Sequence, residues 1–205
     1  NYIDMPLTWR QANGHCLKDG GDTCWVAPAG NRCWAISSTD LAPALIALDA
    51  TVRLVSSRRE RVVSAGLLYA SDGIDYLTKA SDEILVDVTI PPKATRTSFQ
   101  KLARRNAIDF ALLTVACSVA LDPDNRCGSA RIVVGGIASA PVRATDAEAF
   151  LVGNKLTPEV IEEASQLASK PIRAQDNTDT GQRYRKWMIS VHVAKALTEI
   201  ATGDG

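Results

Sequence analysis

The stretch Phe110-Ala-Leu-Leu-Thr-Val-Ala-Cys-Ser-Val-Ala-Leu121 is followed by Asp122-Pro-Asp-Asn125 and then by Arg131-Ile-Val-Val-Gly-Gly-Ile-Ala138. The first segment is a near-continuous apolar run that suits a buried strand or a helix, and its β-branched residues favour the strand. Asp-Pro-Asp-Asn is typical of a tight turn, after which residues 131–138 return to a strand pattern. We therefore predict an antiparallel hairpin at the centre of this part of the chain.

The predicted hairpin is flanked by another strand and by helices. A strand is predicted over residues 98–103, before the hairpin. Three helices are predicted after it: Thr145-Asp-Ala-Glu148 fits a capping box, and Thr157 precedes Pro158, a residue favoured at the first helical position. The last helix carries an apolar stripe made of Tyr184, Trp187, Met188 and Val191. Residues 98–205 therefore predict a small antiparallel sheet with a C-terminal helical cluster.

The preceding part, residues 38–92, combines a helix with strands. The helix is predicted from about residue 40 to 49, and Thr39 or Asp40 can cap it. The strands are predicted over residues 51–56, 61–64 and 83–90, and Pro91-Pro92 ends the last of them. We interpret this part as mixed α/β and residues 91–97 as the crossing into a second unit, so the predicted fold class is α+β.

The bulk composition excludes some classes of protein. The chain has 205 residues, is 46% hydrophobic, and contains 23 Lys+Arg and 23 Asp+Glu. This length suits one large or two small domains, and two fit the pattern better. The balanced charge gives no electrostatic reason to expect nucleic acid or an anionic membrane as partner. Without a membrane-length apolar run or a signal peptide, we expect a soluble, cytoplasmic protein.

Residues 1–37 contain three cysteines, Cys16, Cys24 and Cys33, among glycines that interrupt every short run. Because no periodicity persists, we expect a long functional loop without secondary structure of its own. The cysteine spacing lacks the Cys-x-x-Cys pairs of a zinc ribbon and favours an iron–sulfur cluster over zinc or plain free thiols. Disulfides are the weaker interpretation. Such sites usually take four ligands, and this loop supplies three.

The other reactive residue types receive ordinary interpretations. We expect Cys117 and Cys127 to be buried thiols, His15 to be solvated and His192 to be structural. The Gly135-Gly136 pair inside a predicted strand indicates a close approach of two backbones. The sequence contains no recognisable Ser-His-Asp set, nucleotide P-loop or Gly-x-Gly-x-x-Gly, so we do not expect substrate chemistry in this chain.

Four ordered motifs carry a resemblance to a known family: residues 38–48, 83–91, 101–111 and 131–138. The chain, from about residue 34 to Leu197, resembles the FAD-binding medium subunit of molybdenum hydroxylases, the group of xanthine dehydrogenase and aerobic carbon monoxide dehydrogenase. Residues 38–92 then look like the C-terminal part of a flavin-binding domain, and 98–205 like the C-terminal domain of the medium subunit. The Gly-rich N-terminal domain of the family is absent, and the chain begins at Asn1 without Met, so we expect part of a longer polypeptide.

One branch of the family, the β subunit of 4-hydroxybenzoyl-CoA reductase, inserts a loop with a 4Fe-4S cluster before the Ser-x-Asp helix, and residues 1–37 are similar to that insertion. The resemblance implies that Cys16, Cys24 and Cys33 are three ligands of the cluster and that the fourth lies upstream of Asn1. It also implies FAD contacts from Asp40 to sugar hydroxyls, from the Leu85 backbone near the flavin, and from Lys101 beside the isoalloxazine. The alternatives are Asp40 as a helix cap only and Lys101 as a solvated strand residue.

The resemblance further implies an electron-transfer subunit. Reduced ferredoxin would deliver electrons to the cluster and then to FAD, and a small subunit with 2Fe-2S clusters would carry them to a molybdenum cofactor on a large subunit. The implied reaction is reductive removal of the phenolic hydroxyl of 4-hydroxybenzoyl-CoA. Two alternatives stay open: a related enzyme that oxidises a purine, aldehyde or other heterocycle, and a non-redox scaffold whose loop is stapled by zinc or disulfides.

Overall fold

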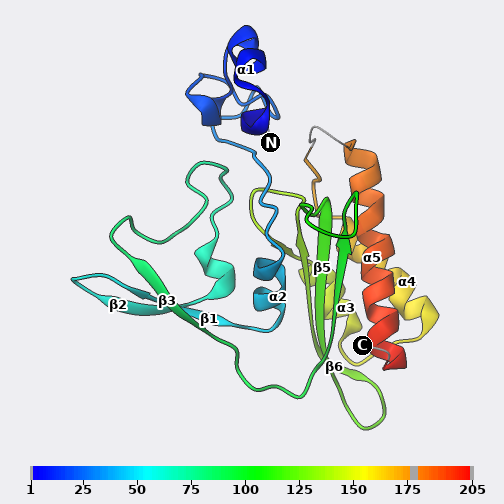
Figure 1. Ribbon diagram of the computed structural model, residues 1–205. Coiled ribbons are helices and arrows are strands. Elements are labelled where there is room, and N and C mark those ends of the chain that lie inside the picture. The colour runs from blue at the N-terminus through cyan, green and yellow to red at the C-terminus, as the bar shows by residue number, and fades with distance from the viewer. Residues whose placement is uncertain (1, 176–179, 204–205) are drawn as a thin grey trace.

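The structure is a computed structural model that describes residues 2–175 and 180–203. A small module, residues 2–35, contains all three N-terminal cysteines and stands at one end of the molecule (Figure 1). Below it lie a three-stranded sheet on one side and a four-stranded sheet backed by helices on the other. Helix α2 (Leu41–Ala47) lies between the two sheets. The predicted α+β class is therefore confirmed.

The four-stranded sheet is antiparallel throughout, with the order β4-β5-β6-β7. Its strands are β4 (Arg96–Leu102), β5 (Leu113–Leu121), β6 (Cys127–Gly135) and β7 (Val142–Arg143). Strands β5 and β6 form the predicted hairpin, with Cys117 opposite Ile132. This confirms the strand interpretation of the apolar run over the helical one.

Strand β5 is apolar at almost every position because both faces of its sheet are covered. Helices α3 (Thr145–Leu151), α4 (Pro158–Ser169) and α5 (Gln182–Thr202) form the helical layer, and α5 packs on β4 and β5 while α3 packs on β6. Every second β5 residue enters the core shared with these helices: Leu113, Val115, Cys117 and Val119. Ala116 points the other way, into a core shared with α2. The period-2 alternation is thus present but hidden by burial on both sides.

The three-stranded sheet has the antiparallel order β2-β1-β3. Its strands are β1 (Thr51–Val55), β2 (Glu60–Ser64) and β3 (Ile84–Thr89), all close to the predicted ranges. With the short helix η3 (Ala65–Leu68), it buries Val52 and Leu54 against Ile46 of α2. Because Ala116 and Val133 of the other sheet join the same core, α2 connects the two sheets.

The prediction that residues 1–37 have no secondary structure is wrong. The module contains α1 (Leu7–Asn13) and two short 3-10 helices, η1 (Tyr2–Asp4) and η2 (Leu17–Asp19). Helix α1 buries no residue and has no side-chain N-cap, so it lacks the apolar period by which helices are recognised. Aromatic contacts hold it instead: the ring centroids of Trp9 and Trp25 are 5.4 Å apart, and both rings contact Tyr2.

The capping box predicted at Thr145 does not form, whereas the start of α4 is confirmed. The N-cap of α3 is Ala144, and it makes no side-chain cap. Glu148 is buried, accepts a hydrogen bond from the backbone N–H of Ile132 at 2.9 Å and pairs with Arg143, so its carboxylate is unavailable for capping. Thr157 does cap α4, through its side-chain oxygen and the N–H of Val160.

Of the apolar stripe predicted on α5, only Met188 packs against the core. Trp187 is 63% exposed, and Tyr184 and Val191 are also exposed. The buried residues of α5 are Arg185, Ile189, Ser190, Val193, Ala196, Leu197 and Ile200. No helix in the described part of the chain is both long and apolar enough to cross a membrane.

Candidate functional site

Asp40 and Lys101, which are 61 positions apart in the sequence, form one polar site. Lys101 Nζ donates to Asp40 Oδ2 at 2.6 Å and to the backbone oxygen of Asp109 at 2.9 Å. Asp40 occupies the N-cap position of α2 but makes no cap with its side chain, and the N–H of Ala42 bonds to Thr39 Oγ1 instead. The structure thus shows Asp40, at the start of α2, paired with a residue of strand β4 and not acting as a helix cap.

One oxygen of Asp40 has no partner in the described part of the molecule. Oδ1 is buried and accepts no hydrogen bond, while Oδ2 is used by Lys101. A buried acceptor without a donor is costly, so this oxygen is suited to a hydroxyl supplied by a bound molecule after a small local adjustment. The free carboxylate oxygen could accept a hydrogen bond from a sugar hydroxyl of FAD, and the adjacent ammonium could lie beside the flavin ring.

The loop that leads from β4 into β5 adds exposed apolar surface beside this pair. Asp109 Oδ2 accepts from the N–H groups of Arg104 and Arg105 at 3.0 and 3.2 Å, which shapes the loop. Ile108 is 93% exposed and Phe110 is 80% exposed. The sequence does not mark Phe110 as a surface residue, because an apolar residue at the head of a buried strand has the same pattern as a core residue. Only its exposure distinguishes it.

Leu85 is not brought to this site by any hydrogen bond or ion pair among the described residues. It lies in β3, where it is paired with Leu54 of β1 and is 40% exposed. Its neighbours in the strand are also exposed: Ile84, Val86 and Val88. The structure therefore joins Asp40 to Lys101 and leaves Leu85 on the open edge strand of the three-stranded sheet.

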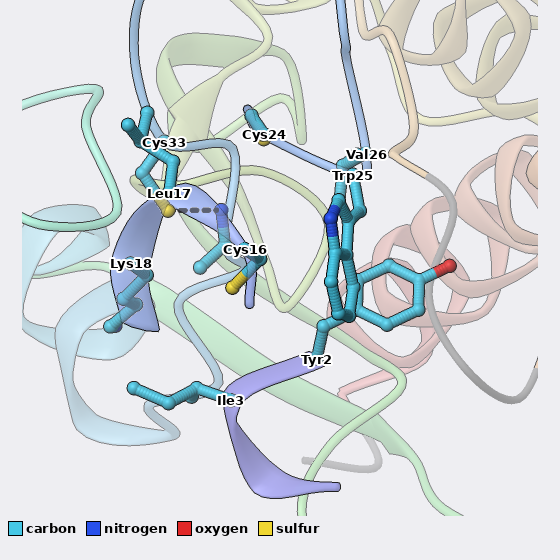
Figure 2. A pocket seen from close by; sticks show the side chains of 10 residues that line it. Tyr2, Ile3, Cys16, Leu17, Lys18, Cys24, Trp25, Val26 and Cys33 are labelled. Carbon is cyan, nitrogen blue, oxygen red and sulfur yellow. Dashed lines mark hydrogen bonds between the residues drawn. The ribbon is translucent and has the colours of Figure 1, made fainter. Parts of the chain in front are cut away.

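The three cysteines of the module line a single pocket, together with Tyr2 and Trp25 (Figure 2). All three are free thiols and all are buried, Cys16 at 7% exposure and Cys24 and Cys33 at 4%. A tight turn brings the first two together: the N–H of Leu17 bonds to the Thr23 oxygen at 2.8 Å, and the N–H of Gly21 bonds to the Cys16 oxygen at 3.0 Å. The loop thus folds so that widely spaced cysteines converge.

The thiol of Cys33 has a defined electrostatic environment. Burial raises its pKa, and a hydrogen bond from the N–H of Ala35 to Sγ, 3.4 Å long, partly offsets that effect. The same hydrogen bond is drawn as a dashed line in Figure 2. A raised pKa means that a cation must displace the proton before the sulfur can act as a ligand. Among residues 2–175 and 180–203, no three His, Cys, Asp or Glu side chains form a group suited to one metal ion.

A charged network braces the module beside this pocket. Asp19 pairs with both His15 and Arg10, and its Oδ2 lies 2.6 Å from His15 Nδ1. The bonds from His15 and then Arg10 lower the pKa of the Asp19 carboxyl. His15, predicted to be solvated, is therefore half-buried and paired. Cys117 and Cys127 are buried thiols in the core, as predicted.

Two families of known protein domains match this chain, one after the other. Residues 26–93 match the FAD binding domain in molybdopterin dehydrogenase, and residues 97–200 match the CO dehydrogenase flavoprotein C-terminal domain. The nicotine 6-hydroxylase medium subunit of Paenarthrobacter nicotinovorans is 32% identical over 156 residues, which cover 76% of this chain and 53% of the relative. The glyceraldehyde dehydrogenase medium chain of Sulfolobus acidocaldarius is 27% identical, over 80% of this chain and 57% of the relative.

Solved structures of known enzymes superimpose on most of this chain. Quinoline 2-oxidoreductase from Pseudomonas putida 86 superimposes with a TM-score of 0.75 at 25% identity, over 82% of this chain and 58% of that one. The chain spans little more than half the length of the relatives it matches. Because the two domain matches follow each other along the chain and the second alone covers half of it, the chain belongs to the FAD-binding, CO dehydrogenase flavoprotein family of molybdopterin dehydrogenases.

Proposed function

We propose that this chain is the flavin-binding, electron-transferring part of a molybdenum hydroxylase-type oxidoreductase. The observation that carries the proposal is the Asp40–Lys101 pair, with its unpartnered carboxylate oxygen, inside a chain of this family. FAD, when bound, supplies chemistry that links one-electron and two-electron partners. We propose that residues 38–92 and 98–205 form separate domains and that the pair holds FAD at their junction.

Each proposed flavin contact has a chemical reason. Asp40 Oδ1 accepts a hydrogen bond from a ribityl or ribose hydroxyl, which ends its isolation. The Lys101 ammonium lies close to the flavin ring and favours negative charge there. Leu85 contributes its backbone near the ring, which requires the exposed strand β3 and the Asp40 site to border the same ligand.

We also propose that the module binds a 4Fe-4S cluster through Cys16, Cys24 and Cys33, with a fourth ligand upstream of Asn1. Three buried, unoxidised thiols on one pocket support this, because cysteine thiolates are the usual ligands of such clusters. In such a cluster each cysteine ligates a different iron. Its ligands therefore surround a larger volume than the ligands of a single zinc ion.

For the whole enzyme we propose partners that the chain does not contain: a large subunit with the molybdenum cofactor, a small subunit with 2Fe-2S clusters, and ferredoxin as donor. With that donor, the reaction is reduction of 4-hydroxybenzoyl-CoA to benzoyl-CoA, and the cysteine module favours it. The second candidate runs in the oxidative direction. The names of the relatives, which include a nicotine hydroxylase, a glyceraldehyde dehydrogenase and a quinoline oxidoreductase, favour that direction.

The cofactor proposals are tested on the full-length protein purified without oxygen. We expect bound FAD, iron and sulfide, with an electron paramagnetic resonance signal after reduction. Cys24→Ser should abolish that signal and leave FAD bound, whereas Cys127→Ala, which removes a thiol outside the module, should retain both. Zinc in place of iron would overturn the cluster proposal, and absence of flavin would favour a scaffold.

The direction of the reaction is tested on the assembled complex. The reductive proposal requires that reduced ferredoxin support conversion of 4-hydroxybenzoyl-CoA. If the complex instead oxidises heterocycles or aldehydes and does not remove the phenolic hydroxyl of 4-hydroxybenzoyl-CoA, the oxidative candidate is correct.

A further inference from the structure

A loop from the three-stranded part of the molecule is docked on the cysteine module. This Gly73 loop, Ser71–Asp75, belongs to the connection between η3 and β3, which rises towards the module in Figure 1. The N–H of Gly73 donates to the backbone oxygen of Cys33 at 2.9 Å, and the Arg32 guanidinium donates to the backbone oxygen of Ser71. Two consecutive module residues are therefore held by one loop.

The loop has internal bonds that keep its shape. Asp72 Oδ1 accepts from the N–H of Ile74 at 2.7 Å, and the N–H of Ala70 bonds to the Tyr76 oxygen at 3.0 Å. Side chains of Asp at such positions stabilise tight turns. These bonds define the turn that places Gly73 against the module.

There is no space for a side chain at Gly73. A Cβ atom there would lie 2.7 Å from Cys33 Sγ, 2.7 Å from Ala35 Cβ and 2.8 Å from Ala35 N. Gly73 does not have the positive φ seen at Gly14 and Gly20, so glycine is needed here for space and not for backbone conformation. A side chain at Gly73 would therefore collide with both partners of the hydrogen bond from Ala35 N–H to Cys33 Sγ.

We infer that Gly73 is a positioning residue that sets the place of the Cys33 sulfur and preserves its N–H···S hydrogen bond. This inference rests on the proposed function. In that context, Gly73 affects the reduction potential of the cluster through one of its ligands, Cys33, and does so from the flavin-binding part of the chain. Hydrogen bonds to ligand sulfurs stabilise the more negative, reduced cluster and so raise its potential. The Gly73 loop therefore couples the module to the rest of the chain.

The test compares Gly73→Ala with Gly66→Ala in the full-length protein. A Cβ at Gly66 would meet Ile46 at an ordinary 3.7 Å, so this control adds the same methyl group without a clash. In iron-free protein, alkylation of each cysteine is followed by peptide mass spectrometry. We expect Gly73→Ala to accelerate labelling of Cys33 relative to Cys24, because the sulfur is displaced from its buried position, and Gly66→Ala to leave the ratio unchanged.

In the iron-loaded protein, Gly73→Ala should weaken cluster retention by about 10–100-fold, as changes around metal ligands do, and shift the cluster potential downwards. If Gly73→Ala does not fold, Arg32→Gln tests the docking of the same loop. It removes the bond to Ser71, and with it the contact of the guanidinium with the Trp34 ring at 3.8 Å, and the same change in labelling is expected. Wild-type labelling and potential in the folded variant would overturn the inference. A wild-type protein without iron would instead defeat the cluster proposal and leave the labelling test valid.

Discussion

Asp40 shows how a single residue can satisfy a local pattern and serve a distant partner. Its position before α2 suits an N-cap, yet its carboxylate bonds to Lys101 and leaves Oδ1 without a donor. A cap needs only neighbouring residues, whereas this pair needs α2 to be packed beside the four-stranded sheet that carries Lys101. The sequence could therefore place Asp40 at the head of a helix but could not decide which group its side chain contacts.

We predict that Lys101→Met weakens FAD binding to the full-length protein about tenfold, which corresponds to about 1.4 kcal/mol for the lost charged contact. The reason is that the Asp40 charge beside the ligand loses its counter-ion. Flavin fluorescence titration measures the effect. Lys93→Met is the matched control, since Lys93 pairs with Asp49 at 2.5 Å in the same manner away from the pair. Equal losses in both variants would contradict the assignment.

Glu83 is a buried carboxylate whose charge is fully compensated. It accepts from Arg61 at 2.7 and 2.8 Å and from the N–H of Ala80 at 2.7 Å. The Arg61 bonds, followed by the Ala80 bond, lower the pKa of Glu83 from 4.5 to about 2. Between these two values the unfolded chain binds more protons than the folded one, so the folding free energy contributed by Glu83 is lost as the pH falls.

We predict that Glu83→Gln removes the contribution of Glu83 to the pH dependence of stability. The wild-type protein should lose stability steadily from about pH 4.5 to about pH 2, and the variant should lose less over the same interval although it starts less stable. Urea unfolding midpoints at a series of pH values provide the measurement. Asp82→Asn changes the adjacent carboxylate, which is exposed and pairs with Arg58 at 3.2 Å, and should retain the wild-type slope.

At the scale of the element, two helix starts with similar sequences have different structures. Thr157 caps α4 and Pro158 occupies its first turn, as the local pattern predicts. Thr145 stands at the start of α3, but Glu148 of the same motif is drawn into the sheet by the N–H of Ile132. Local motifs predict helix ends well only where no buried donor competes for the same side chain.

We predict that Thr157→Ala destabilises the protein by about 1 kcal/mol, the typical cost of a lost N-cap. Thr145→Ala, the matched change at the start of α3, should cost clearly less, because no side-chain cap exists there. Thermal unfolding followed by circular dichroism compares the two variants. A larger loss in Thr145→Ala would mean that the capping box does form.

At the scale of the whole molecule, α2 is the part that joins the two sheets. Gly135 of β6 approaches it closely: a Cβ there would lie 2.4 Å from Pro43 Cγ and 2.5 Å from Thr114 Oγ1. Asp49, just after α2, also links Lys93 of the crossing to Arg131 of β6. The close backbone approach predicted at Gly135-Gly136 occurs at Gly136, where a Cβ would lie 3.2 Å from the backbone oxygen of Ala111. At Gly135 the neighbouring atoms belong to side chains, and the missing Cβ leaves room for Pro43 of α2.

We predict that Gly135→Ala destabilises the protein by about 1–3 kcal/mol through overpacking, with a fall in Tm of about 2–4 °C for each kcal/mol in a chain of this size. FAD affinity should fall as well, because α2 carries Asp40. Gly128→Ala tests the same substitution in the same strand, where a Cβ would meet Ala120 O at 3.7 Å, and should change Tm little. Scanning calorimetry with and without FAD distinguishes the two variants.

The sequence by itself determined the order of most helices and strands after residue 37, the β5–β6 hairpin and the family. These features depend on period, turn chemistry and ordered motifs, all of which act over short distances along the chain. The helix α1 escaped prediction because it has no apolar face and depends on aromatic contacts. Only the tertiary structure decided which side chains meet: Asp40 with Lys101, three cysteines around one pocket, and Gly73 against Cys33. The physical reason is that these contacts join residues whose separation in space is set by the packing of both sheets on α2 and of the module on the Gly73 loop.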